Sequence, residues 1–347
     1  MKTNTSSWLL PALLAGSAAA QVPTVLPTGL ERVWAGNNGT GTGYATQNGI
    51  SQNLYLAPFV LGTPISGIGF RRTATTSDYV AVTVDFEVTL SSTAADLTTL
   101  SATFANNLGA DATVVFPRQL INVPARLANS SPTDFFPVMN TVPWLFNLGP
   151  NLLIQCKSYG TGNVNTWRMD RCFERTTAGE AVSWGRACSA ATVGSTSSAP
   201  AYMPGASLSF TLAGAAASQA ALAFLGFDLS SAFGVVPLPL DLGVAGMTGC
   251  TLLVPPTVVL PGATDATGAA ALPLAIPNDP TLSAAGFGMQ WFYFDPNAGN
   301  PLGMLSTQGR LFRVGPLVCP NRYVWNLSNV AATTGSLQAG GPVVQIL

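Results

Sequence analysis

The chain has no histidine, the side chain whose unperturbed pKa lies nearest neutral pH. That absence excludes nucleophilic sites of the Ser-His-Asp and Cys-His types, together with zinc or iron sites that use histidine ligands. Charged residues make up only 8% of the 347 residues, and their signs nearly cancel to a net charge of −1. We therefore expect no broad electrostatic field that would recruit nucleic acid or an anionic membrane.

A surface with so little charge favours association, either with components of an extracellular matrix or with further copies of the chain. The alternative is that the many Ser, Thr, Asn and Gly residues solvate the surface adequately. The chain also lacks a G-x-G-x-x-G loop and a lysine-bearing phosphate loop, so no nucleotide cofactor is expected.

The first twenty residues have the pattern of a secretory signal peptide. Lys2 gives a positive start, residues 8–14 form a short apolar core, and the alanines at 18–20 offer a cleavage site before Gln21. The segment is too short to span a membrane, and no later apolar run reaches transmembrane length without interruption. The alternative, a buried helix, is disfavoured by Pro11. We predict a secreted mature chain, either released or held at the cell surface.

Glycine and proline are abundant, at 35 and 26 residues, and apolar residues make up 48% of the chain. Disordered segments are usually poor in apolar residues, so this composition favours many short strands joined by turns. The pattern is strictest over residues 79–90, where apolar residues from Val80 to Leu90 alternate with small or polar ones. Such alternation is typical of a half-buried strand.

About eight strand patterns precede a segment rich in Ser, Ala, Gly and Pro at 185–205, and about seven follow it. The sequence therefore predicts an all-β protein with two antiparallel β-sandwich domains. The first, over 21–184 after the signal peptide at 1–20, is jelly-roll-like, and the second, over 185–315, is immunoglobulin-like. The extension at 316–347 carries YVWNL and PVVQIL, which are expected to add strands to a sheet edge, conceivably in the first domain.

An ordered set of landmarks runs through the second region. They are Ala187-Cys188-Ser189, Pro204-Gly205-Ala206-Ser207-Leu208, Pro237-Leu238-Pro239-Leu240-Asp241-Leu242, Gly249-Cys250, Pro277-Asn278-Asp279-Pro280, Gln290-Trp291 and Asp295-Pro296. Through these residues the segment 185–315 resembles a C-terminal β-sandwich module that recurs in uncharacterised secreted bacterial proteins. Residues 69–72 and 107–111 resemble the jelly-roll domains that often precede it. The resemblance implies a fold and an extracellular address, and it brings no catalytic residues.

The five cysteines are expected to form disulfides, because the chain is exported and has no C-x-x-C motif. If the strands that carry Cys156 and Cys172 form a hairpin, these two residues face each other directly and can bridge. Cys188 and Cys250 then make the second bond, which the resemblance also implies. Cys319 is left over, either free and buried as a small apolar residue or paired with another chain; we favour the buried form.

Asp85 and Glu87 form the best carboxylate pair, because they share one strand face at a spacing of about 7 Å. Such a pair suits glycoside hydrolysis, in which one carboxyl acts as an acid and the other as a base or nucleophile. The alternative, which we favour, is that both lie on the solvated face of a half-buried strand.

Asp295, Asn297 and Asn300 offer oxygen ligands that a calcium ion would accept. The same residues fit an Asx-type turn between the last two strands of the second domain.

Aromatic residues are the remaining sign of a binding site. Trp144, Tyr159 and Trp167 lie near a predicted hairpin rich in Gly and Asn, where exposed rings could stack on a sugar. Large aromatic residues more often fill cores, and Trp34 and Trp184 are expected to do so.

These patterns predict a secreted, non-catalytic protein of extracellular structure, adhesion or cell-surface assembly. Its expected partners are extracellular or cell-surface components, polysaccharide among them. A carbohydrate-binding sandwich is the alternative function, and a histidine-free glycosidase that uses Asp85 and Glu87 is a third.

Overall fold

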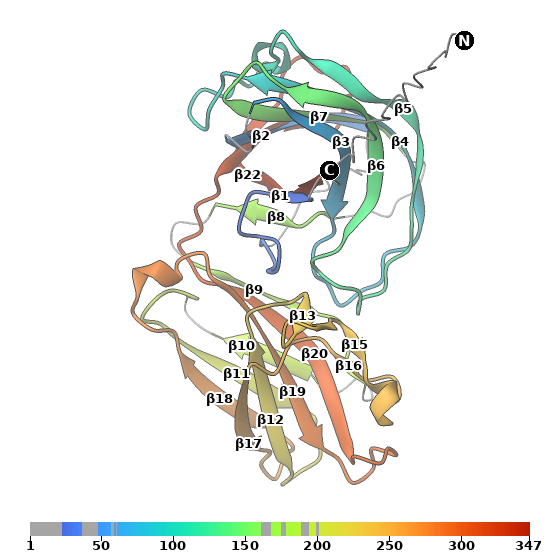
Figure 1. Ribbon diagram of the computed structural model, residues 1–347. Coiled ribbons are helices and arrows are strands. Elements are labelled where there is room, and N and C mark those ends of the chain that lie inside the picture. The colour runs from blue at the N-terminus through green and yellow to red at the C-terminus, as the bar shows by residue number, and fades with distance from the viewer. Residues whose placement is uncertain are drawn as a thin grey trace, which may run out of the picture.

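The computed structural model describes residues 23–36, 48–56, 59, 61–160, 168–174, 178–188, 194–198 and 201–347. These residues form antiparallel sheets in packed layers, which confirms the predicted all-β, sandwich-type fold (Figure 1). The described helices are short 3-10 turns, η1 (Phe104–Asn107), η2 (Leu242–Ala245) and η3 (Pro280–Leu282). Within these ranges, no helix has the length and apolar character needed to cross a membrane. The predicted signal peptide lies outside the described residues.

The upper region in Figure 1 combines residues 23–174 with residues 316–347 as two facing sheets. The large sheet has the order β5 (Thr113–Val123), β4 (Val82–Thr93), β7 (Asn151–Tyr159), β2 (Asn48–Leu56), β21 (Asn321–Asn326), β22 (Ser336–Pro342) and β8 (Arg171–Phe173). The small sheet has the order β1 (Thr24–Leu26), β23 (Val344–Ile346), β3 (Thr63–Arg71) and β6 (Phe135–Phe146). All neighbouring strands in both sheets are antiparallel.

The alternating segment predicted at 79–90 supplies the inner surface of the large sheet. Val84, Phe86 and Val88 are fully buried against the small sheet, whereas the residues between them face outward. The strand begins three residues later than predicted, because β4 starts at Val82 and Val80 is 47% exposed. Period-two alternation therefore identifies the buried face correctly and the strand boundary less well.

The C-terminal strands take interior positions in both sheets of the upper region, where the sequence led us to expect edge strands. β21 lies between β2 and β22, and β23 lies between β1 and β3. Their central side chains are apolar and buried, with Tyr323, Val324 and Val344 all fully inaccessible to solvent. A buried strand must pair the backbone N–H and C=O groups on both of its edges. An interior position in the sheet provides those partners.

The lower region, residues 178–315, has two main sheets with a second core between them, together with two small two-stranded sheets. One has the order β17 (Val258–Ala263), β12 (Ala220–Gly226), β19 (Gly286–Phe294), β20 (Met304–Arg313) and β9 (Glu180–Trp184). The other has the order β10 (Gly194–Ser198), β11 (Ser207–Ala213) and β18 (Ala270–Ala275). The expected boundary after residue 184 separates β9 from its own sheet, because β9 pairs with β20.

Residues 228–254 leave the five-stranded sheet after β12 and cover its outer face. This excursion carries β13 (Ser231–Ala232), β14 (Val236–Pro237), β15 (Leu240–Asp241), η2 and β16 (Thr251–Leu252). Leu238 and Met247 are buried against Phe224 and Phe292, the outward-facing residues of β12 and β19. The proline-rich stretch therefore serves as a covering layer whose hydrogen bonds lie outside the main sheets.

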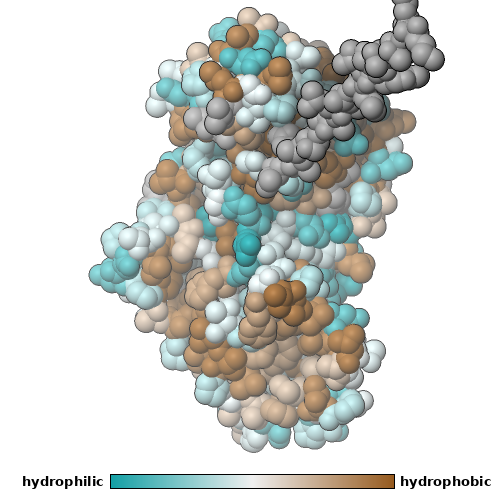
Figure 2. Space-filling model, viewed as in Figure 1, coloured by the Kyte–Doolittle hydropathy of each residue, from teal (hydrophilic) through white to brown (hydrophobic). Residues whose placement is uncertain are grey.

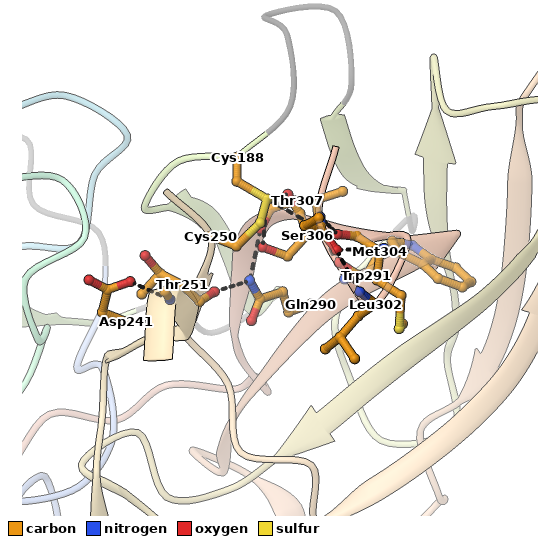
Figure 3. The surroundings of a disulfide bond; sticks show 12 residues. Cys188, Asp241, Cys250, Thr251, Gln290, Trp291, Leu302, Met304, Ser306 and Thr307 are labelled. Atoms are coloured by element: carbon orange, nitrogen blue, oxygen red, sulfur yellow. Dashed lines mark hydrogen bonds between the residues drawn. A yellow bond between two sulfur atoms is a disulfide. The ribbon is translucent and has the colours of Figure 1, made fainter. Parts of the chain in front are cut away.

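The returning end of the excursion is fixed by a disulfide and a buried amide (Figure 3). Cys188 bonds Cys250, as predicted, with their Cα atoms 4.6 Å apart. Beside this bond, the Gln290 side chain is fully buried and donates to the backbone oxygens of Thr251 and Thr307 at 2.9 and 2.8 Å. Because a buried amide must find partners, Gln290 specifies where the excursion rejoins β19 and β20.

The two regions meet through a junction of buried apolar side chains, and a buried ion pair of the upper region lies beside it, near Arg313 of the lower region. Trp34 from the upper region and Trp184 from the lower region pack in one cluster, at 1% and 0% exposed. Nearby, the Arg71 guanidinium lies 2.6 Å from the Asp170 carboxylate, and both side chains are fully buried. Breaking such a pair leaves an uncompensated buried charge, so the pair fixes the arrangement of the segments that hold it.

Prolines interrupt the four longest edge strands away from their ends. They are Pro117 in β5, Pro143 in β6, Pro261 in β17 and Pro273 in β18. A proline has no N–H to donate to an added strand, and proline in an edge strand therefore opposes edge-to-edge pairing between sheets. At these four edges, association between copies of this chain would then use side chains rather than a continued sheet.

The predicted bond between Cys156 and Cys172 is wrong: Cys172 bonds Cys319. The prediction assumed that the two strands form a hairpin, but β2, β21 and β22 separate β7 from β8 in the large sheet. Cys156 faces the core between the sheets, where it is a free, buried thiol. The expectation for Cys319 is corrected as well, since it is a disulfide partner rather than a free residue.

Burial raises the pKa of the Cys156 thiol to about 12, because the ionised form would lose its hydration in the core. We predict that Ellman's reagent at pH 8 finds no thiol in the folded chain and one thiol in guanidinium chloride. The free energy of unfolding should also fall as the pH rises above 9.0, where only the unfolded thiol ionises. Rapid labelling of the folded wild type, absent from a Cys156→Ala variant, would contradict this placement.

Candidate functional site

The carboxylate pair singled out in the sequence lies on the outer face of the large sheet. Asp85 receives a forked contact from Arg118, whose Nε and Nη2 lie 3.0 and 2.7 Å from Asp85 Oδ2. Glu87 lies 3.0 Å from Lys157 Nζ, and the Tyr159 hydroxyl donates to it at 3.3 Å. Lys157 faces Glu87 directly across β4 and β7, so the strand register itself builds this contact.

The Arg118 guanidinium also lies 3.8 Å from the centre of the Tyr159 ring. It therefore connects Asp85 with Tyr159, and all four carboxylate oxygens of Asp85 and Glu87 have partners within this cluster. Neither carboxylate lines any of the cavities described below. The arrangement holds three neighbouring strands in register on a partly exposed face, where ion pairs contribute modestly to stability.

Of the three aromatic residues proposed as a sugar platform, the two that the structure describes, Trp144 and Tyr159, lie on different sheets. Trp144 is 6% exposed and packs against Phe146 in the upper core, and its indole N–H donates to the Asp111 carbonyl at 3.2 Å. Tyr159 lies on the outer face of the other sheet under Arg118. Trp144 is therefore a core residue, because its position on β6 faces inward. Trp167 lies outside the described residues.

The residues proposed as calcium ligands form the turn between β19 and β20. Asp295 Oδ1 accepts from the Asn297 amide at 2.8 Å, and Asn300 Oδ1 accepts from the amides of Leu302 and Met304 at 3.1 and 3.3 Å. These bonds confirm the alternative Asx-type turn. Across the described part of the chain, no group of three or more Cys, Asp or Glu side chains converges to hold a metal ion.

A buried charged cluster at the junction was not recognised from the sequence. Asp170 accepts from the Ala35 amide at 3.1 Å, and Arg71 donates to the carbonyl oxygens of Leu30 and Val33 at 2.7 and 3.1 Å. Burial raises the pKa of Asp170, an effect that Arg71 opposes, and burial lowers the pKa of Arg313 to about 10. The hydrogen bonds that Arg71 and Asp170 form with the backbone of residues 30–35 hold the N-terminal segment in place. Burial protects these bonds from competing water.

A polar groove with a volume of about 500 Å³ lies at the end of the β21–β22 hairpin. Its lining includes Trp325 together with the polar residues Asn326, Ser328, Thr334 and Ser336. Asn326 Oδ1 accepts from the amide and hydroxyl of Ser328 at 3.1 and 3.0 Å, which fixes the shape of the loop. The buried Trp325 Nε1 has no hydrogen-bond acceptor within the described ranges. A strand pattern marks Trp325, but only the pairing with β22 places it in a groove.

An apolar pocket of about 370 Å³, here called the seam pocket, opens between the edge strands β17 and β18. Its wall includes Leu225, Leu260, Leu274, Ile276 and Phe287. On the face of the lower region that Figure 2 shows, many of the surface residues are apolar and are coloured tan or brown. No residue pattern predicts this pocket, because the apolar residues of a sandwich core alternate in the same way whether its two sheets close tightly or leave a gap.

Comparisons with models of protein families and with curated proteins find no match to this chain. The resemblance through the landmarks of residues 185–315 therefore stays an expectation. The geometry offers a polar groove with an indole, an apolar pocket, and a carboxylate pair engaged in ion pairs. Any function assigned to the chain has to be argued from these features.

Proposed function

We propose that the protein is a secreted, non-catalytic element of extracellular structure, adhesion or cell-surface assembly. The observation that carries the proposal is the closed chain path of the upper region. Its first and last strands, β1 and β23, are neighbours, and the Cys172–Cys319 bond joins segments 147 residues apart. A path closed in this way resists unravelling from either terminus, which suits a protein that works outside the cell without chaperones.

The disulfides and the state of the carboxylates support the same proposal. Two disulfides, Cys172–Cys319 and Cys188–Cys250, are the kind of cross-link that persists in oxidising compartments. Asp85 and Glu87 are both bound to cations on a sheet face, which is the arrangement of structural ion pairs. The low charge leaves side-chain shape and apolar contact as the main means of recognition.

A hydrolysis screen tests the non-catalytic proposal. We expect the purified mature chain to release no product from a panel of extracellular polysaccharides and proteins, and Glu87→Gln to behave like the wild type. Glu31→Gln is the matched control, since Glu31 is an exposed carboxylate remote from the large sheet's outer face. Turnover that is lost in Glu87→Gln and kept in Glu31→Gln would contradict the proposal and favour a glycosidase.

Carbohydrate binding is the second candidate function, and the Trp325 groove favours it. An indole beside hydroxyl and amide side chains offers both a stacking surface and hydrogen-bonding groups, which are the elements that an aromatic and polar ligand site needs. The Trp325 N–H is itself buried, so a sugar would meet only the exposed part of this half-buried ring and the polar side chains beside it. Trp167 stays a further prediction for the same function.

A glycan array tests this second candidate. We expect binding of at least one polysaccharide fragment by the wild type, and a loss of about fivefold or more in Trp325→Ala, because a stacked ring contributes on the order of 1 kcal/mol or more. Phe294→Ala is the control, as Phe294 is a 39% exposed ring of the lower region. Silence across a broad array, or an equal loss in both variants, would remove the Trp325 groove as a sugar site.

A further inference from the structure

The lower region carries both an exposed apolar projection and an apolar pocket. The projection is the β13–β14 hairpin, residues 231–237, here called the finger. We propose that the finger of one copy docks into the seam pocket of the next, so that copies of the chain assemble head to tail. This inference rests on the proposed function, for which it names a second copy of the chain as a partner.

The tip of the finger exposes two large apolar side chains. Phe233 and Val235 are 76% and 79% exposed, so neither finds cover within its own chain. Phe233 has φ +54° and is followed by Gly234 at φ +73°. The hairpin turn requires positive φ at these two positions, and a bulky residue rarely accepts that conformation, so placing Phe233 here costs backbone strain.

The base of the finger is held firmly, so its tip has a fixed position. Asp228 accepts hydrogen bonds from the Ser230 amide at 2.9 Å and from the Ser231 hydroxyl at 3.1 Å. It also forms an ion pair with Arg32 of the upper region at 2.8 Å. On the other strand of the finger, the Leu238 amide donates to the Ser230 carbonyl at 3.0 Å. A preorganised projection loses little conformational freedom when it binds.

The seam pocket is built to receive side chains rather than a strand. Its two flanking edge strands carry Pro261 and Pro273 near their centres, which removes donors that an added strand would need. Its wall residues are all apolar, and its volume of about 370 Å³ lies at the small end of the range for ligand sites. The apolar residues of the finger tip are therefore suitable occupants.

Finger and pocket carry no charge at their contacting residues, and the whole chain has a net charge of only −1. Copies therefore repel one another weakly. Because the finger and the pocket are different patches, their contact is heterologous and generates a ring or an open row. One such contact buries far less than the roughly 1,200–2,000 Å² of a stable interface, so we expect weak pairing in dilute solution and assembly at high local concentration.

Disulfide trapping between two singly substituted chains tests the contact directly. Val235→Cys places a thiol on the finger and Ala285→Cys places one at the wall of the pocket. Mixed in a glutathione redox buffer, the two variants should form a cross-linked heterodimer about fivefold or more faster than Val235→Cys mixed with Val318→Cys. Val318 is the control because it is 69% exposed and lies outside the pocket. Equal rates, or Val235→Cys pairing mainly with itself, would overturn the proposal.

Sedimentation velocity on the otherwise native chain provides the second readout. The wild type should show larger species as its concentration rises, and Phe233→Asp should abolish them. Val244→Asp should leave them unchanged, since Val244 is an 86% exposed apolar residue of the same excursion but outside the finger. Both substitutions are at exposed positions, so neither should unfold the protein.

The proposal fails if the wild type stays monomeric at every concentration, or if the two Asp variants behave alike. It also fails if an apolar dye fills the seam pocket while the finger variants change nothing, because the pocket would then serve a small ligand. None of these results affects the proposed extracellular, non-catalytic function. That function fails separately, through turnover that depends on Glu87.

Discussion

The C-terminal strands are the constraint on which the rest of the structure depends. β21 completes the large sheet between β2 and β22, and β23 completes the small sheet between β1 and β3. Neither sheet is continuous until the last part of the chain has returned from the lower region. The lower region is therefore inserted into the upper one, and folding the upper region requires contacts between residues nearly the whole chain apart, which slows folding but secures both termini.

The junction between the regions follows from this path, because the chain crosses it on the way out and again on the way back. Trp34 and Trp184 fill the apolar part of the junction, and the Arg71–Asp170 pair holds the N-terminal segment beside it. A buried apolar junction of this kind opposes hinge motion between the regions. A protein whose parts are fixed in this manner presents its surface features, the Trp325 groove and the finger, in constant relative positions.

Local pattern predicts the local part of this structure and fails where distant segments decide the outcome. The alternation through Val84 and Phe86 identifies a buried face, because side-chain direction in a strand depends only on residue parity. The Cys188–Cys250 bond was also predicted correctly. The Cys156–Cys172 bond was not, since facing cysteines require adjacent strands and the insertion of β2, β21 and β22 between β7 and β8 has no local signature. Trp144 was misjudged for a related reason: the covering sheet determines which aromatic residues are buried.

The candidate sites show the same limit. Asp85 and Glu87 share a strand face as predicted, but only the neighbouring strands reveal that Arg118 and Lys157 occupy their oxygens. The seam pocket depends on how far two edge strands stand apart, which no residue pattern records. The turn of the finger has a local signal, because Gly234 lies between short apolar segments and glycine is favoured in tight hairpin turns. The exposure of Phe233 beside it has no such signal.

Native-state hydrogen exchange tests the central claim most directly, since it measures the free energy of opening for each strand. If the C-terminal strands complete both sheets, the buried amides of β21 and β23 should open with the same free energy as those of β2 and β3. Exchange of β21 and β23 through a separate opening of much lower free energy, while β2 and β3 stay protected, would show that the upper region stands without them and would contradict the account.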